Sequence, residues 1–222
     1  GSGPNGAIVH YRAIAGADRE LASNDLLLLD SGGHYRDGTT DITRTIAIGT
    51  PPKGAVAAYS HVLQSHIQLA MAKFPAGTNG KQLDAIARAP LWAVGLDFAH
   101  GTGHGVGHVL SVHEGPASIS KRGEVALEAG MVLSNEPGYY QTGHWGIRIE
   151  NLIVVTPAKQ TGFLEFETIT LCPLDRRLID KTLLDAGEIG WIDHYHRAVY
   201  EQLHPHLSPM AKSWLEAACR PL

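Results

Sequence analysis

The sequence is poor in several features that mark particular classes of protein. Its two cysteines, Cys172 and Cys219, are too few and too far apart for a disulfide framework, so we interpret both as free thiols suited to a reducing compartment. No apolar run approaches the roughly 18 to 20 residues that a membrane span requires. The net charge of −4 gives no reason to expect nucleic acid or a membrane surface as a partner. What is left is an ordinary globular composition, and we expect a single domain over residues 1–222.

The start of the chain has no methionine and no charged-then-apolar leader, because it begins Gly1-Ser2-Gly3-Pro4-Asn5-Gly6. We therefore expect a fragment or a processed product, in which any targeting signal would be hidden. The free thiols make the cytoplasm our expected location.

Apolar periodicity and turn residues predict a mixed α+β chain. Short strands are expected at residues 7–11, 26–30, 41–48, 130–137, 147–155 and 163–171. Loops should join them at residues 31–40, 100–116 and 138–146. Helices are expected at residues 51–74, at 80–94 with a bend or break at Pro90, at 189–203, and from Pro209 onward with Ser208 as the cap. We find no short-period repeat and no low-complexity linker.

Four carboxylates occupy places where apolar sequence leaves them little water: Asp30, Asp41, Glu136 and Glu150. Each one alone could reach solvent or form a single ion pair, but four in one chain favour a shared site. Asp30 and Asp41 flank one hairpin, and paired strands lie about 4.8 Å apart. The other two flank a second strand pair. Two divalent cations would balance four such charges, so a dinuclear metal site is the simplest arrangement.

Five of the thirteen histidines lie between residues 100 and 144, and His104 is the natural nitrogen ligand. It lies in a glycine-rich loop, and glycines let the backbone approach an ion closely. A loop of this kind is a weak signal alone and gains weight from the four carboxylates. An oxygen-rich set with one imidazole favours manganese, cobalt or iron(II) over structural zinc.

Six segments, taken in order, resemble the motifs of the Xaa-Pro aminopeptidases. They are Leu29-Asp30-Ser31-Gly32-Gly33, Thr40-Asp41-Ile42-Thr43-Arg44-Thr45, His100-Gly101-Thr102-Gly103-His104-Gly105-Val106-Gly107, Val112-His113-Glu114-Gly115-Pro116, Asn135-Glu136-Pro137-Gly138-Tyr139-Tyr140 and Gly146-Ile147-Arg148-Ile149-Glu150-Asn151. The resemblance runs from about Pro4 to the C-terminus. It implies the pita-bread fold, a curved and mostly antiparallel sheet covered by helices, without the elements that precede the matching stretch in that family.

The resemblance also implies a role for each site residue. Asp30 would bind one ion, His104 and Glu136 the other, and Asp41 and Glu150 both. The two divalent ions are expected to be Mn²⁺, with Co²⁺, Zn²⁺ or Fe²⁺ as alternatives. The residues matching the family's substrate-site positions are His10, His100, His113 and Arg148. Hydrogen-bonded core imidazoles and a simple ion pair are the structural alternatives for these residues.

The activity that the resemblance implies is removal of an N-terminal residue that precedes proline. We predict that a hydroxide bridging the two metals attacks the carbonyl, that Glu136 shuttles the proton, and that His113 and His10 donate hydrogen bonds to the oxyanion. Peptides with proline in second position would be the substrates, and a homodimer or companion chain could supply the missing part. The alternatives are a prolidase acting on dipeptides, a non-catalytic binding module and a metal-free creatinase-like hydrolase.

Overall fold

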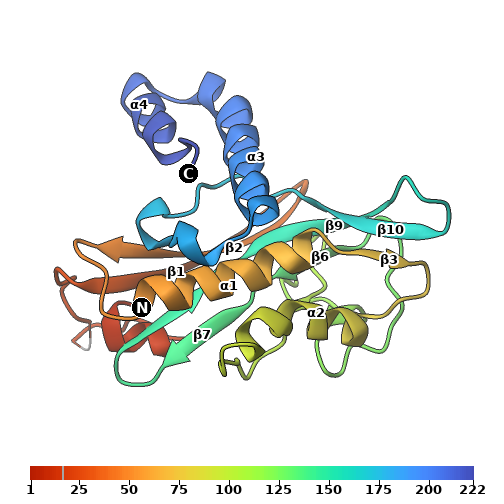
Figure 1. The fold of residues 1–222 in the computed structure, drawn as a ribbon, viewed down its shortest axis with the longest axis horizontal. Helices are drawn as coiled ribbons and strands as arrows, with labels where there is room; N and C mark the ends of the chain where they lie inside the picture. Colours follow the sequence, from red (N-terminus) through yellow and green to blue (C-terminus); the bar gives the residue numbers. More distant parts are fainter. Residues whose placement is uncertain (17) are drawn as a thin grey trace.

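Antiparallel strand pairs and the helices that cover them make up the chain in this computed structural model, which describes residues 1–16 and 18–222 (Figure 1). A long hairpin joins β1 (Asp25–Tyr35) and β2 (Gly38–Ile48). The largest sheet has the order β3 (Lys73–Pro75), β10 (Phe163–Thr168), β9 (Asn151–Pro157) and β6 (Val132–Asn135). Smaller pairs are β4 (Gly103–His104) with β5 (Ser118–Ile119), and β7 (Gly138–Gln141) with β8 (Trp145–Arg148).

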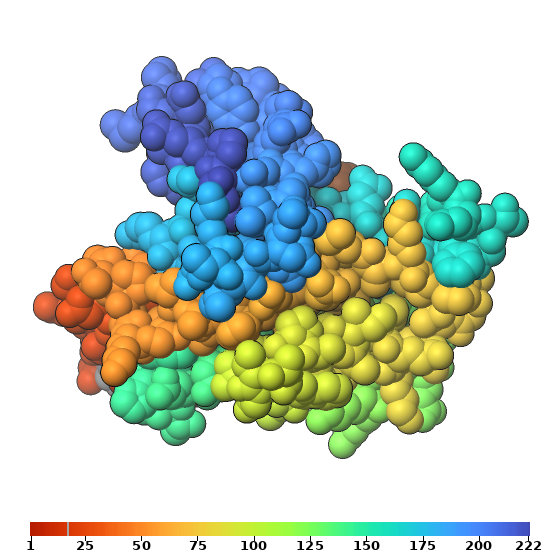
Figure 2. Space-filling model, viewed as in Figure 1, coloured from red at the N-terminus to blue at the C-terminus, as the bar shows by residue number. Residues whose placement is uncertain are grey.

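The described residues include four α-helices: α1 (Ala55–Ala70), α2 (Gly80–Trp92), α3 (Ala186–Leu203) and α4 (Pro209–Ala218). One-turn 3-10 segments lie at Gly3–Ala7, Arg176–Leu178, Lys181–Leu183 and His204–His206. In the view of Figure 2, α1 and α2 cover one face of the molecule, and the C-terminal helices form a separate rise above α1. No helix among the described residues combines the length and the apolar character needed to cross a membrane.

The core lies on both sides of α1. Tyr59, Leu63 and Ile67, which the predicted apolar stripe contains, are fully buried in one cluster with residues of β8, α3 and α4. A second cluster, under α2, joins Leu83 and Leu133 to the large sheet. The α1 stripe therefore buries the face that its spacing predicts, and this burial fixes the helix across the strands.

The helix predictions are confirmed, with shifted ends. The first helix stops at Ala70, and Phe74 lies in β3 instead. The second continues through Pro90 to Trp92. Ser208 caps α4 as expected, because its side chain accepts a hydrogen bond from the Ala211 amide.

Three strand-and-loop predictions are wrong. Residues 7–11 are not a strand, because the 3-10 helix Gly3–Ala7 and a turn occupy this region. The loop at 31–40 is mostly strand: β1 and β2 run on to Tyr35 and Gly38. Gly32 faces Asp41 across the ladder, and a β-carbon there would lie 2.7 Å from the carbonyl oxygen of Thr40. This glycine therefore marks a close approach of two strands, whereas the sequence suggested a turn.

The third error concerns residues 138–155. The expected loop at 138–146 is the hairpin of β7 and β8, whose aromatic residues pair well across strands. The single strand expected at 147–155 is divided between β8 and β9, with Ile149 and Glu150 in neither. This break turns the chain next to Glu150.

Candidate metal centre

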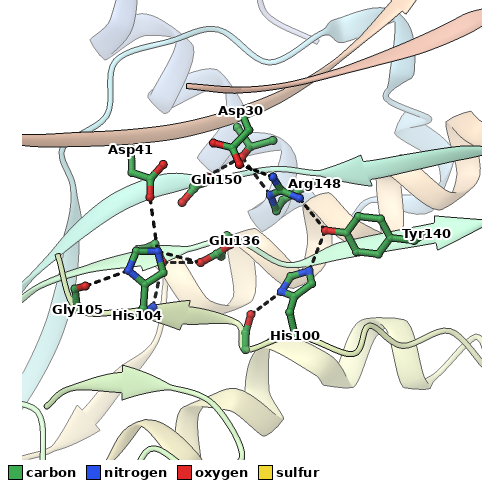
Figure 3. Close-up of polar contacts among 12 residues, drawn as sticks. Asp30, Asp41, His100, His104, Gly105, Glu136, Tyr140, Arg148 and Glu150 are labelled. Carbon is green, nitrogen blue, oxygen red and sulfur yellow. Dashed lines mark hydrogen bonds and ion pairs between the residues drawn. The ribbon is translucent and has the colours of Figure 1, made fainter. Parts of the chain in front are cut away.

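The residues predicted for the site come from separate elements and line one cavity of about 450 Å³. The strands β1, β2, β4 and β8 carry Asp30, Asp41, His104 and Arg148. Glu136 follows β6, and Glu150 lies in the break between β8 and β9. The cavity wall also includes His10, His100 and His113. Figure 3 shows the side chains of Asp41, His104, Glu136 and Glu150 pointing toward one another.

Strand register explains the convergence. Asp30 pairs with Thr43 and Asp41 with Gly32, so the two aspartates lie diagonally, two residues apart along the hairpin. The ladder of β6 and β9 ends at Asn135 opposite Asn151, which places Glu136 and Glu150 just beyond the last pair. The sequence argument that each acidic pair flanks a strand pair is thus confirmed by the register.

The tightest group consists of Asp41, His104 and Glu150, whose ligand atoms all lie within 4.8 Å of one another. The Nε2 atom of His104 is 3.5 Å from Oδ2 of Asp41 and 3.3 Å from Oε1 of Glu136. Its Nδ1 atom lies 2.9 Å from the carbonyl oxygen of Gly105, to which it donates (Figure 3). This hydrogen bond directs Nε2 toward the carboxylates, as in metal-binding imidazoles.

Burial and the charges of neighbouring groups shift the pKa values of Glu150, Glu136 and His104. Burial, followed by the charges of Glu136 and Asp41, raises the pKa of Glu150 to about 8. Burial likewise raises the pKa of Glu136, although His104 opposes it. Burial alone would lower the pKa of His104, but the hydrogen bond to Asp41 and the nearby glutamates raise it to about 8. The group therefore holds protons that a divalent cation would displace, and its donor atoms fit such an ion.

Asp30 lies outside the tight group. Its Oδ2 atom accepts a 2.6 Å hydrogen bond from Arg148, and its side chain is about half exposed. Asp30 also lines the cavity, and this ion pair uses only one of its two carboxylate oxygens. Arg148 also donates to the hydroxyls of Thr43 and Tyr140, at 3.1 and 3.0 Å.

The other predicted histidines differ in their surroundings. His100 is half-buried between the Gly101 carbonyl and the Tyr140 hydroxyl, at 2.7 and 2.8 Å, and burial lowers its pKa to about 4. His113 is exposed, and its ring centre lies 4.1 Å from that of His104. Burial and the charge of His104 lower the pKa of His113. His10 is exposed at the edge of the cavity.

Sequence reasoning missed three hydroxyl groups, two that hold carboxylates and one that joins two other residues of the cavity. Thr43 donates to Glu150 at 2.6 Å, and Ser134 donates to Glu136 at 2.8 Å. The Tyr140 hydroxyl joins His100 to Arg148. The signal for Thr43 was present, because it shares a strand face with Asp41.

Comparison with known proteins gives a consistent set of matches. Residues 1–157 match the metallopeptidase family M24, and residues 162–222 match the C-terminal region of peptidase M24. The chain is 46% identical to the probable Xaa-Pro aminopeptidase P of Laccaria bicolor, over all of this chain and 36% of that protein. It is 47% identical to aminopeptidase P1 of Lotus japonicus, over 99% of this chain and 35% of that protein. It thus spans about a third of the length of these relatives.

Solved structures agree with the sequence matches. The X-prolyl aminopeptidase of Caenorhabditis elegans, described as a cytosolic enzyme with a di-nuclear active site, superposes with a TM-score of 0.95 at 44% identity, over all of this chain and 38% of that one. Prolidase from Pyrococcus furiosus superposes with a TM-score of 0.66 at 33% identity, over 75% of this chain and 46% of that one. The fold expected from the motifs is therefore confirmed.

Proposed function

Because the chain belongs to metallopeptidase family M24, we propose that it carries the catalytic site of a metal-dependent Xaa-Pro aminopeptidase. Such an enzyme hydrolyses the bond between an N-terminal residue and a following proline. The observation that carries the proposal is the group formed by Asp41, His104 and Glu150, with donor atoms within 4.8 Å of one another on a cavity that also holds Asp30 and Glu136.

Two divalent ions are the proposed cofactors, with Mn²⁺ as the first choice because the five proposed ligands are four carboxylates and a single imidazole. Asp30 would hold one ion, His104 and Glu136 the second, and Asp41 and Glu150 both. When bound, the ions lower the pKa of water and polarise the substrate carbonyl.

The chain's own residues would supply the remaining steps. Glu136 is the candidate for moving the proton to the leaving nitrogen, because its raised pKa suits a group that accepts and returns a proton. His100 is kept neutral by burial and its Nδ1 is held by the Gly101 carbonyl, so its Nε2 could bind substrate by exchanging the Tyr140 hydroxyl for a substrate group. His113 and His10 would donate hydrogen bonds to the developing oxyanion from the open side of the cavity.

The test is metal content measured together with cleavage of a Xaa-Pro peptide. Asp41→Ala and Glu150→Ala should lose bound Mn²⁺ and activity together. Glu201→Ala, which removes an exposed carboxylate on α3, is the matched control and should keep both. Full turnover by either site variant would overturn the proposal.

Prolidase activity is the second candidate, and the match to the prolidase from Pyrococcus furiosus supports it. Cleavage of a Xaa-Pro tripeptide but not of a Xaa-Pro dipeptide would exclude it. A non-catalytic binding module would instead bind peptide without bound metal or turnover.

We also propose that residues 1–222 act as one catalytic unit, because a single apolar cluster joins Tyr59 and Leu63 of α1 to Ile192 of α3 and Leu215 of α4. A homodimer or a companion chain is the proposed assembly, which sedimentation at several protein concentrations would detect. The cytoplasm is the proposed location, on the strength of the free thiols and of the relative described as cytosolic.

A further inference from the structure

We propose that Arg44 is a positioning residue for the metal centre, and that it makes the metal affinity depend on the Tyr195 hydroxyl of helix α3. Arg44 is no ligand in any scheme above, and it contacts neither the cavity nor its histidines. The inference rests on the proposed metal site, and it concerns how the C-terminal segment holds that site in place.

Arg44 is a buried cation without a charged partner. Its side chain is 5% exposed, and among residues 1–16 and 18–222 no carboxylate forms an ion pair with it. All three nitrogens donate to uncharged oxygens. The acceptors are the backbone carbonyls of Thr43, Glu150, Cys172 and Pro173, the side-chain oxygen of Asn151 and the hydroxyl of Tyr195, at 2.7 to 3.2 Å. Keeping a guanidinium in this place costs desolvation free energy, so every one of these acceptors matters to it.

The contact with Glu150 bears on the metal centre. Glu150 lies in the break between β8 and β9, where the regular ladder does not hold the backbone. Its amide donates to the Thr43 carbonyl at 3.1 Å, and its carbonyl accepts from Nη1 of Arg44 at 2.7 Å. Thr43 also binds its carboxylate at 2.6 Å. Two consecutive residues of β2 therefore set where this carboxylate lies.

The contact with Tyr195 extends the arrangement to α3, which rises from the strands in Figure 1. Nη2 of Arg44 donates to the Tyr195 hydroxyl at 2.9 Å. That hydroxyl lies 2.9 and 3.0 Å from the carbonyl oxygens of Cys172 and Thr170, and its one proton can be donated to either. With the side chain of Asn151 and the carbonyl of Cys172, it thus fixes one branch of the guanidinium, while the other branch holds Glu150. Because the guanidinium is planar and rigid, tilting one branch displaces the other.

A purely structural role for Arg44 would change folding stability and leave metal affinity unchanged, so the test measures both. Tyr195→Phe removes only the hydroxyl and keeps the buried ring. Tyr59→Phe is the matched control, since Tyr59 is fully buried and its hydroxyl has no hydrogen-bond partner among the described residues. Mn²⁺ dissociation constants are measured by titration calorimetry on the metal-free protein, well below the unfolding temperature of each variant.

We expect Tyr195→Phe to weaken binding of at least one Mn²⁺ by about ten-fold, the lower range for loss of a group that orients a ligand. Tyr59→Phe should bind as the unaltered protein does. Unchanged Mn²⁺ affinity in Tyr195→Phe, whatever its unfolding temperature, would overturn the inference.

Arg44→Lys gives a second measurement, because it keeps the charge and loses the planar fork. If it folds, it should bind Mn²⁺ more weakly than Tyr195→Phe does, and equal or tighter binding would contradict the inference. If it does not fold, Tyr195→Phe decides alone. Failure of this inference can be distinguished from failure of the proposed function. If the unaltered protein binds Mn²⁺ tightly but cleaves no Xaa-Pro peptide, only the proposed activity is excluded. If the unaltered protein binds no Mn²⁺, both the proposed activity and the role of Arg44 are excluded.

Discussion

Loading the metal-free protein with Mn²⁺ should release protons, and the number can be worked out from the site. His104 and Glu150 both have a pKa of about 8 in the metal-free protein, for the opposite reasons given above. At pH 7 each group is then about nine-tenths protonated, which amounts to about 1.8 protons for the two together. A ligand atom must lose its proton to bind the ion, so these protons appear in solution.

The pH dependence provides the control within the same experiment. At pH 9 each group with a pKa of about 8 is about one-tenth protonated, so the two should release only about 0.2 protons. The raised pKa of Glu136 adds to the release in the same direction at the lower pH. Metal affinity should therefore rise between pH 7 and pH 9, because fewer protons compete with the ion.

Titration calorimetry in buffers of different protonation enthalpy measures the released protons directly, since the observed heat changes linearly with the buffer's enthalpy. Release that is the same at pH 7 and pH 9 would refute the reasoning, even if Mn²⁺ binds tightly. Such a result would mean that both His104 and Glu150 have already lost their protons at pH 7 without the metal, and that the repulsion among the carboxylates is relieved in another way.

Three further predictions concern stability and loop geometry. Burial lowers the pKa of His66 to about 3, so its neutral form stabilises the fold above pH 6.5. This contribution is lost as the pH falls from 6.5 toward 3, by up to about 1.4 kcal/mol of unfolding free energy per pH unit. Thermal unfolding across this pH range, with His66→Leu as the comparison, measures the loss. Gly103→Ala should weaken Mn²⁺ binding in a folded protein, because the β-carbon of the new alanine would lie 1.9 Å from the Ser134 carbonyl oxygen and displace the neighbouring His104. An unchanged Mn²⁺ affinity in this variant would contradict the prediction. Leu63→Ala should cost about 2 to 5 kcal/mol of unfolding free energy in chemical denaturation, against less than about 0.5 kcal/mol for Met210→Ala, which is 86% exposed.

The sequence predicted which side chains would lie together on one cavity better than it predicted the elements that carry them. Their position beside apolar runs was sufficient to predict that Asp41, Glu136 and Glu150 share one cavity, because burial of a carboxylate is costly enough to require a partner. The hairpin between Asp30 and Asp41 was predicted, but with a long loop. Glycine in that segment has two physical meanings, a turn or a close strand approach, and only the register decides between them.

The pairing of Asp30 with Arg148 was beyond sequence reasoning for a different reason. Both were predicted as site residues, but 117 intervening positions separate them, and their hydrogen bond depends on β1 and β8 lying side by side. Contacts of this kind depend on how sheets are arranged relative to one another. Local periodicity carries no information about that arrangement.

Strand β2 shows how far a local pattern can be interpreted. Its alternation of Asp, Thr and Thr with Ile, Arg and Ile predicts a strand with two unlike faces, and a half-buried strand normally buries the apolar one. In the structure Asp41, Thr43 and Thr45 are buried, whereas Ile42 and Ile46 are only half-buried. The polar face is inside because it holds the acidic site.

Arg44, on the opposite face of β2, is buried as well, because the C-terminal segment covers it with carbonyl and hydroxyl oxygens. Strand β2 therefore contacts the proposed metal ligands on one face, through Thr43, and helix α3 on the other, through the adjacent residue Arg44. The Tyr195 hydroxyl of α3 and the Glu150 carbonyl both bind the guanidinium of Arg44. We therefore expect a displacement of α3 that tilts this guanidinium to move the backbone of Glu150 as well. Arg44 is thus one buried link between the two matched regions, and its contribution can be measured as metal affinity.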